Sequence, residues 1–185
     1  GIAWNGARFV AVGTSGTILT SLDGEAWTSR DVETTQQLDD VTWGGGQFVA
    51  VAYKTVYTSA DGINWIGHEV EVSGYLSLRS VAWSGSAYVA IATDYSDSEI
   101  LTSLDGETWT SVHTTWLGLR DLVWGNDIFV ATGEANYSVT STDDGATWTN
   151  NYLGFSGYMS HVDWDGSQFV SSYGGTLYTS PDGVN

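Results

Sequence analysis

Acidic side chains are the most abundant groups in this 185-residue chain that could do chemistry. The chain has 22 Asp and Glu residues and only five Lys and Arg residues. Two carboxylates facing each other across a cleft can hydrolyse a glycosidic bond. Asp40 and Asp121 occupy the same place in a repeat described below, where Ser80 and His161 stand in other copies. Because the residue type varies at this position, we interpret it as the solvated lining of a central channel. We therefore predict no catalytic residues.

Metal chemistry is the second possibility that the acidic residues raise. The stretch "DYSDSE" at 94–99 groups Asp94, Asp97 and Glu99; we interpret it as an acidic loop, with a weak calcium site as the alternative. The chain has no Cys to supply thiolate ligands. Its three histidines, His68, His113 and His161, are not spaced as the ligands of one metal ion would be. We expect neither a metal site nor a cofactor, and we interpret the histidines as structural.

A short motif recurs along the chain, and it explains many of the acidic residues. It reads "SLDGEAW" at 21–27, "SADGINW" at 59–65, "SLDGETW" at 103–109, "STDDGATW" at 141–148 and "SPDGVN" at 180–185. The Asp can accept backbone N–H groups in a tight turn, and the Gly can adopt the left-handed conformation. The Trp that follows can insert between sheets. The motif therefore predicts a structural turn between two strands.

A second motif keeps step with the first and sets the period of the chain. It begins at Trp4, Trp43, Trp83, Trp124 and Trp164, with spacings of 39, 40, 41 and 40 residues. A period near 40 with strand-like content is typical of a β-propeller, in which each repeat forms one antiparallel sheet of four strands. We predict an all-β, five-bladed propeller in one domain, 1–185, with blades at about 1–37, 38–77, 78–117, 118–157 and 158–185.

The last of these blades is incomplete in the given sequence. It reaches the turn motif but not the strand that should follow, so we expect it to have three strands and an exposed edge. An unpaired strand edge is a template for another strand. We therefore expect that blade 5 could pair through this edge with a strand from elsewhere.

Composition limits the partners of such a domain. The formal net charge of −17 repels phosphate backbones, so we expect no nucleic acid partner. No apolar run approaches the roughly 20 residues that a membrane span needs, so we expect no membrane insertion.

The turn motif resembles the Asp-box, or BNR, repeat S-x-D-x-G-x-T-W of sialidases, sortilin-type receptors and xyloglucan hydrolases. Ser141, Asp143, Gly145, Thr147 and Trp148 match its full spacing, and the other copies are one residue shorter between Asp and Gly. The resemblance covers the whole chain. It implies a propeller whose boxes face away from the ligand, and an extracellular or cell-surface location.

Sialidases of this family hold their substrate with three converging arginines, and that pattern is not evident here. The chain has four arginines, of which Arg79 and Arg120 occupy equivalent places in "LRSVAW" and "LRDLVW". We interpret these two as structural, and we assign the chain to the non-sialidase members.

Function is expected in the variable links on the face opposite the boxes. The links carry more aromatic residues than the repeat requires, and aromatic rings suit sugars or peptides. We predict a non-catalytic binding module for a neutral glycan or a protein or peptide ligand, bound near the ring axis through Trp116, Tyr75, Tyr95 and Tyr158. The alternatives are a hydrolase-like propeller and a purely structural repeat domain of a larger surface protein.

Overall fold

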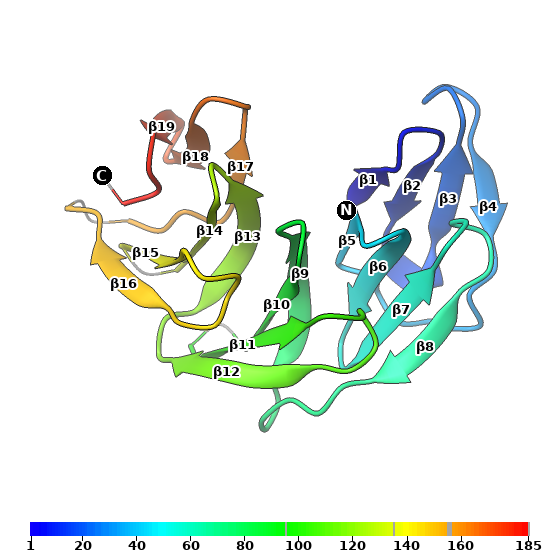
Figure 1. Cartoon of the computed structure of the whole chain (residues 1–185), viewed down its shortest axis with the longest axis horizontal. Coiled ribbons are helices and arrows are strands. Elements are labelled where there is room, and N and C mark those ends of the chain that lie inside the picture. Colours follow the sequence, from blue (N-terminus) through cyan, green and yellow to red (C-terminus); the bar gives the residue numbers. More distant parts are fainter. Residues whose placement is uncertain (95, 135, 155–156, 185) are drawn as a thin grey trace.

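Five antiparallel sheets follow one another around a ring in the computed structural model, which describes residues 1–94, 96–134, 136–154 and 157–184 (Figure 1). Four sheets have four strands and the last has three. The predicted all-β, five-bladed propeller is thus confirmed. The described part of the chain forms one short 3-10 turn, η1 (Thr14–Gly16), and none of its helices could cross a membrane.

The strands of each blade follow the chain from the ring axis outward. Blade 1 consists of β1 (Ile2–Trp4), β2 (Phe9–Val12), β3 (Ile18–Ser21) and β4 (Thr28–Arg30). Blade 2 consists of β5 (Asp40–Gly44), β6 (Gln47–Ala52), β7 (Thr55–Ser59) and β8 (Ile66–Glu69). Blade 3 consists of β9 (Ser77–Trp83), β10 (Tyr88–Thr93), β11 (Ser98–Ser103) and β12 (Thr110–Thr115). Blade 4 consists of β13 (Leu119–Gly125), β14 (Ile128–Gly133), β15 (Tyr137–Ser141) and β16 (Thr149–Tyr152). Blade 5 consists of β17 (Val162–Trp164), β18 (Phe169–Tyr173) and β19 (Thr176–Ser180).

Short turns between the first and second strands set the register of the blades, and the turns of blades 2 and 4 have only two residues. In blade 4 the central residues of the turn, Asn126 and Asp127, have φ of 51° and 59°. Positive φ at both central residues is what a hairpin turn that matches the strand twist requires, and Asn and Asp tolerate it better than other residues with a Cβ atom. The turn pairs Gly125 with Ile128 at the ends of β13 and β14.

Hydrogen bonds between neighbouring loops show which loops share a face of the ring. The Gln47 side chain donates to the Asp105 carbonyl at 2.5 Å, which joins the first turn of blade 2 to the Asp box of blade 3. On the other side Lys54 donates to the Gly74 carbonyl at 2.8 Å, which joins the two-residue link between β6 and β7 to the longer link between β8 and β9. We call these two sides the box face and the link face.

Aromatic residues fill the space between consecutive blades. In blade 2, Phe48 lies 4.6 Å from the ring centre of Trp43 and 6.3 Å from that of the box Trp65. Blades 1, 3 and 4 repeat this arrangement of three aromatic side chains. The middle side chain of the three is fully buried in blades 2, 3 and 4, as Phe48, Tyr88 and Phe129. Because a single blade cannot cover its own faces, these interfaces hold the ring together.

The ribbons of blades 1 and 5 stand apart in Figure 1, and the extensive strand contacts among the described residues join only blades that are consecutive in sequence. A cavity of about 490 Å³ lies between the two end blades, with Gly1 and Ile2 on one side and Val162 and Leu177 on the other.

Candidate functional site

The Asp-box turns are closed networks of local hydrogen bonds. In the box of blade 3, Asp105 Oδ1 accepts the N–H groups of Glu107 and Thr108 at 2.9 and 2.8 Å, and the Ser103 hydroxyl at 3.0 Å. The Trp109 indole donates to the Gly106 carbonyl at 3.2 Å. Backbone donors stabilise the carboxylate and lower the pKa of Asp105 to about 2. The turn already uses Oδ1 of Asp105 for three hydrogen bonds, which supports a structural role.

Carboxylates at the ring axis join the innermost strands of successive blades. Asp40 Oδ2 accepts the Val81 N–H at 3.0 Å, and Asp121 Oδ2 accepts the Val162 N–H at 3.0 Å. Ser80 lies between the two acids, with its Oγ 3.1 Å from Asp40 Oδ2 and 3.1 Å from Asp121 Oδ1. The equivalent positions of blades 2, 3 and 4 thus form one chain of polar contacts at the axis.

Partial removal from water makes these two carboxyl groups weak acids. Burial raises the pKa of Asp40 to about 6, and burial also raises the pKa of Asp121. Ser80 has one hydroxyl proton, so it cannot donate to both carboxylates at once. A protonated Asp40 that donates to Ser80, which donates to Asp121, satisfies all three groups. Asp40 and Asp121 thus lie at the axis as interpreted, but each is half-buried and hydrogen-bonded to the next blade.

The mouth of the channel on the link face holds the second polar layer. A cavity of about 220 Å³ is lined by Asp39, Arg79, Thr93, Arg120, Ser160 and His161. A second cavity, of about 340 Å³, shares Asp39 and Arg79 and extends outward past Gln36, Gln37, Tyr53 and Ser77. We call the two together the mouth groove. Its residues come from the starts of the innermost strands and from the links, so the fold itself brings them together.

Ion pairs hold the arginines of the mouth groove in place. Arg79 Nη1 lies 2.9 Å from Asp39 Oδ1, across the junction of blades 2 and 3. Arg120 pairs with Glu134 in blade 4. Both guanidinium groups stay about one-third exposed, at 35%. Arg79 therefore keeps N–H donors beyond its ion pair that can face a ligand, because a guanidinium has five.

The aromatic residues predicted to bind a ligand lie on the link face, but they do not belong to the mouth groove as far as it is described. Trp116 is 67% exposed and follows the outermost strand of blade 3, with its ring 6.1 Å from that of Tyr137. Tyr75 is 89% exposed, and Tyr158 packs 5.6 Å from Tyr173. Tyr95 lies outside the described residues. The three described residues are thus separate platforms around the ring.

Several of the other predicted polar residues have local partners, whereas the buried Nε2 of His113 has none among the described residues. Asp94 Oδ1 accepts the N–H groups of Ser96 and Asp97 in a tight turn, at 3.2 and 3.0 Å. Glu99 is buried and accepts the Ser73 N–H at 2.8 Å, so it is not part of an acidic loop. His68 contacts the Thr58 hydroxyl at 2.9 Å. Among the described residues no group of three or more His, Asp or Glu side chains could hold a metal ion.

Comparison with known proteins supports the fold. No protein-family model and no curated protein sequence matches the chain. Solved structures do match, among them YCF48 bound to D1 peptide, with a TM-score of 0.69 and 15% identity over 97% of this chain and 66% of that chain. A chain of the nidogen/laminin complex has a TM-score of 0.73 and 13% identity, over 95% of this chain and 74% of that one. The extracellular domain of BT4673 from B. thetaiotaomicron has a TM-score of 0.73 and 12% identity, over 97% of this chain and 26% of that one.

These similarities establish the propeller fold, and several of the neighbours are binding or scaffold proteins. The chain spans 66% or less of the length of the first structures that it matches.

Proposed function

We propose that this propeller is a non-catalytic binding module for a peptide segment, which docks in the mouth groove of the link face. The observation that carries the proposal is the set of fixed donors and acceptors around the axis, from Asp39 and Arg79 to Arg120 and His161. A peptide backbone offers carbonyl and amide groups at regular intervals, which such a set can bind. That YCF48 was solved with a bound D1 peptide supports peptide binding by a propeller of this kind.

Charge favours a neutral or cationic segment over an acidic one. Asp39 and Glu134 neutralise the two arginines of the groove locally, and the whole chain carries a net charge of −17. Acidic ligands are therefore repelled at long range. The remaining N–H groups of Arg79 then act as hydrogen-bond donors to peptide carbonyls.

The polar contacts at the axis support binding without turnover. Asp40 and Asp121 are the pair of acids that the described structure brings together, and their oxygens accept backbone N–H groups and share Ser80. A hydrolase would need one free carboxylate to attack or to activate water and another to protonate the leaving group. Both acids here already join neighbouring strands.

A neutral glycan is the second candidate, and the exposed ring of Trp116 favours it. The edge of this ring packs against Tyr137, which leaves 67% of the residue exposed. A fixed aromatic face can stack on a sugar. Tyr75, Tyr158 and Tyr95 remain proposed as further contacts for either ligand. From the turn motif we also propose that the chain belongs to the Asp-box propellers and that it is extracellular or at the cell surface.

A peptide array followed by titration of the best peptide tests the proposal. Replacing both Arg79 and Arg120 by Ala should weaken binding about tenfold or more, because each removes a charge-assisted donor. Arg8→Ala is the matched control, since Arg8 lies on the box face next to Gly62. Unchanged affinity in the double variant, or cleavage of the peptide, would overturn the proposal. Binding of glycans in place of peptides, lost in Trp116→Ala, would establish the second candidate.

A further inference from the structure

A cavity of about 650 Å³ lies on the box face, between the boxes of blades 3 and 4. Short or apolar side chains form much of its wall, among them Ala87, Leu104, Val112 and Ala146. Three carboxyl groups also line it, those of Asp105, Asp143 and Asp144. We call this space the outer groove.

A long polar side chain occupies this place at the two preceding interfaces. It belongs to the residue directly before the aromatic residue of the second strand, which is Arg8 in blade 1 and Gln47 in blade 2. Gln47 donates to the Asp105 carbonyl at 2.5 Å, and the Arg8 side chain packs beside Gly62 in the box of blade 2. In blade 3 the equivalent residue is Ala87, which lines the groove and has no polar group to donate. The space between blades 3 and 4 is therefore open.

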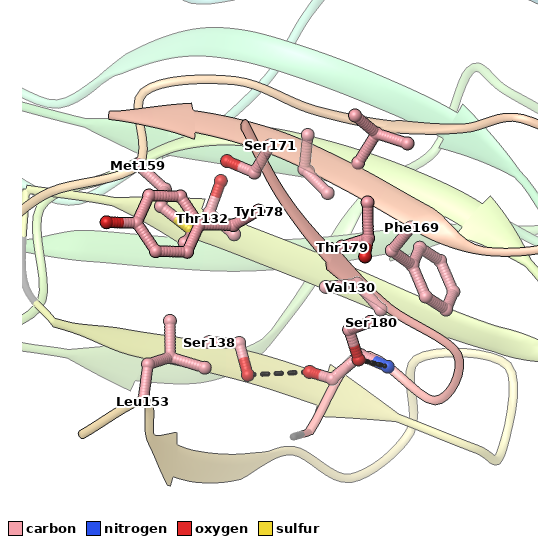
Figure 2. Close-up of a pocket in the computed structure, with 13 residues that line it drawn as sticks. Val130, Thr132, Ser138, Leu153, Met159, Phe169, Ser171, Tyr178, Thr179 and Ser180 are labelled. Carbon is pink, nitrogen blue, oxygen red and sulfur yellow. Dashed lines mark hydrogen bonds between the residues drawn. The ribbon is translucent and has the colours of Figure 1, made fainter. Parts of the chain in front are cut away.

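The interface that follows is again bridged by side chains. Asn126 of blade 4 donates to the Pro181 carbonyl in the box of blade 5 at 3.3 Å. At the same interface, Figure 2 shows Ser138 donating to the Gly183 carbonyl of that box, at 2.8 Å. The box of blade 4 differs from the boxes on either side, because among the described residues no side chain of the preceding blade donates a hydrogen bond to it.

A hydroxyl group in the wall of the outer groove is also left open. In the other four-stranded blades the equivalent threonine contacts a polar side chain of the outermost strand, at 2.9 to 3.0 Å: Thr20 with Arg30, Thr58 with His68 and Thr140 with Asn151. In blade 3, Thr102 and Val112 both line the groove. Within the described part of the chain the Thr102 hydroxyl forms no hydrogen bond. A donor that enters the groove can therefore bind it.

Negative charge surrounds the outer groove. Hydrogen bonds from the Thr147 hydroxyl and N–H lower the pKa of Asp143, and backbone N–H groups lower the pKa of Asp105 to about 2. Both are therefore ionised at neutral pH. Asp144, the additional residue of this box, is exposed and has a φ of 56°. The lining contains no Lys or Arg, so the groove attracts cations.

We propose that the outer groove binds a cationic segment of a partner protein, and that an arginine of this segment enters the space that Gln47 fills at the preceding interface. A guanidinium on a long stem supplies the donors that Ala87 lacks, both for the Thr102 hydroxyl and for the carboxylates of the wall. The apolar part of the wall suits the aliphatic stem. The proposal does not depend on peptide binding in the mouth groove, which shares no residue with the outer groove.

The peptide acetyl-GVRVG-amide and its citrulline analogue form a matched pair of probes, since citrulline has nearly the shape of arginine without its charge. Methyl resonances of Leu104 and Ala146 can report binding at this site by NMR titration. We expect the arginine peptide to shift both resonances and to bind about threefold or more tightly than the citrulline peptide, because a charge-assisted hydrogen bond is lost. Equal affinity of the two peptides, or binding that leaves Leu104 and Ala146 unshifted, would overturn the proposal.

Ala87→Gln supplies from within the protein the side chain that the peptide would otherwise supply. The change introduces the residue type found at the equivalent position Gln47, so the protein should fold. It should weaken binding of the arginine peptide about fivefold or more, since the new amide occupies the space and its acceptors. Ala26→Gln, at an exposed position in the box of blade 1, is the control and should leave the affinity unchanged. Unchanged affinity in Ala87→Gln would show that the peptide does not use this space.

Asp144→Asn tests the charge of the outer groove without filling it. Asn tolerates a positive φ, so the turn should keep its shape. Binding of the arginine peptide should weaken about two- to fivefold, which is the effect of one exposed ion pair. Asp127→Asn is the matched control, because Asp127 has a similar φ of 59° and does not line the groove. Equal affinities of the two variants would contradict a contact between the arginine and this carboxylate.

Discussion

At the scale of residues, one residue type serves two opposite electrostatic roles in this propeller. The box aspartates accept several backbone N–H groups near water, which lowers the pKa of Asp105. The axial Asp40 is withdrawn from water, which raises its pKa. The difference follows from position in the repeat, because the box forms an exposed turn and the axial position lies where several blades meet.

The box and its Trp should differ in their contribution to stability. Asp105→Ala removes an acceptor of two backbone N–H groups and should lower the free energy of unfolding by about 1–2 kcal/mol. Trp109→Ala removes a ring that packs on Tyr88 and on the cluster between blades 2 and 3, and it should cost about 3–5 kcal/mol. Urea unfolding of the parent protein and of both variants measures the two losses of stability, and the loss should be larger for Trp109→Ala. A larger effect of Asp105→Ala would contradict the assignment of Trp109 to the core.

The axial acid should make the protein less stable as the pH rises. The pKa of Asp40 is about 6 in the folded state and about 4 in the unfolded chain. The folded state therefore binds more protons between these values, and the free energy of unfolding should fall through this window by at most about 3 kcal/mol. Box aspartates act with the opposite sign, because their lowered pKa gives stability that is lost below about pH 4.

Urea unfolding between pH 4.5 and 7 measures this contribution. Asp40→Asn should remove most of the decrease, whereas Asp127→Asn, in an exposed turn on the box face, should preserve it. Equal pH dependence in the parent protein and in Asp40→Asn would show that another group is responsible.

At the scale of elements, the order of strands in each blade could be predicted because local patterns determine it. The Asp-Gly turns and the two-residue hairpins, such as that at Asn126 and Asp127, fix where strands begin and end. Contacts between blades were harder to predict. Asp40, Ser80 and Asp121 meet although their residue types differ, and a repeat alignment shows only that they share a position. For Ala87 a signal did exist, since the equivalent residues of the two preceding blades are long and polar.

The outer edge of β19 gives a prediction about strand pairing. In the other blades a fourth strand pairs with the equivalent of β19, and Leu177 on β19 is 73% exposed. A synthetic peptide with the sequence of residues 107–115, ETWTSVHTT, should therefore add to this edge and slow amide hydrogen exchange at Thr176–Ser180. The same peptide with Trp replaced by Ala should protect these amides less. Protection that is equal for both peptides, or absent, would count against this pairing.

At the scale of the whole molecule, the two faces of the ring have different tasks. The box face carries the repeated turns, whose acceptors are satisfied locally, and the link face carries the mouth groove and the exposed aromatic rings. Variation in the links can therefore change the ligand without disturbing the turns that set the blades. The groove residues were not predicted as a site, because Arg79 and Arg120 were interpreted as structural. Their ion pairs fit that role, and their exposure allows a second one.

Hydrogen exchange should show a gradient along the ring. Blade 3 has a neighbour on each side, and so do blades 2 and 4, whereas blades 1 and 5 each pack extensively against one neighbour. Amides of β10 and β11 should therefore exchange most slowly and those of β1 and β18 at least tenfold faster, because the end blades can open alone. Uniform exchange across all five sheets would instead indicate one cooperative unit.

The restriction of extensive contacts to consecutive blades also bears on how the chain acquires its structure. These contacts connect residues about one to one and a half repeats apart, as between Asp40 and Val81 and between Gln47 and Asp105. A hairpin pair formed anywhere can serve as a nucleus, and each new blade then docks on a finished surface, as in linear repeat proteins. Loop closure, the slow step for most all-β folds, is thereby divided into short segments. The chain can thus assemble blade by blade as it leaves the ribosome.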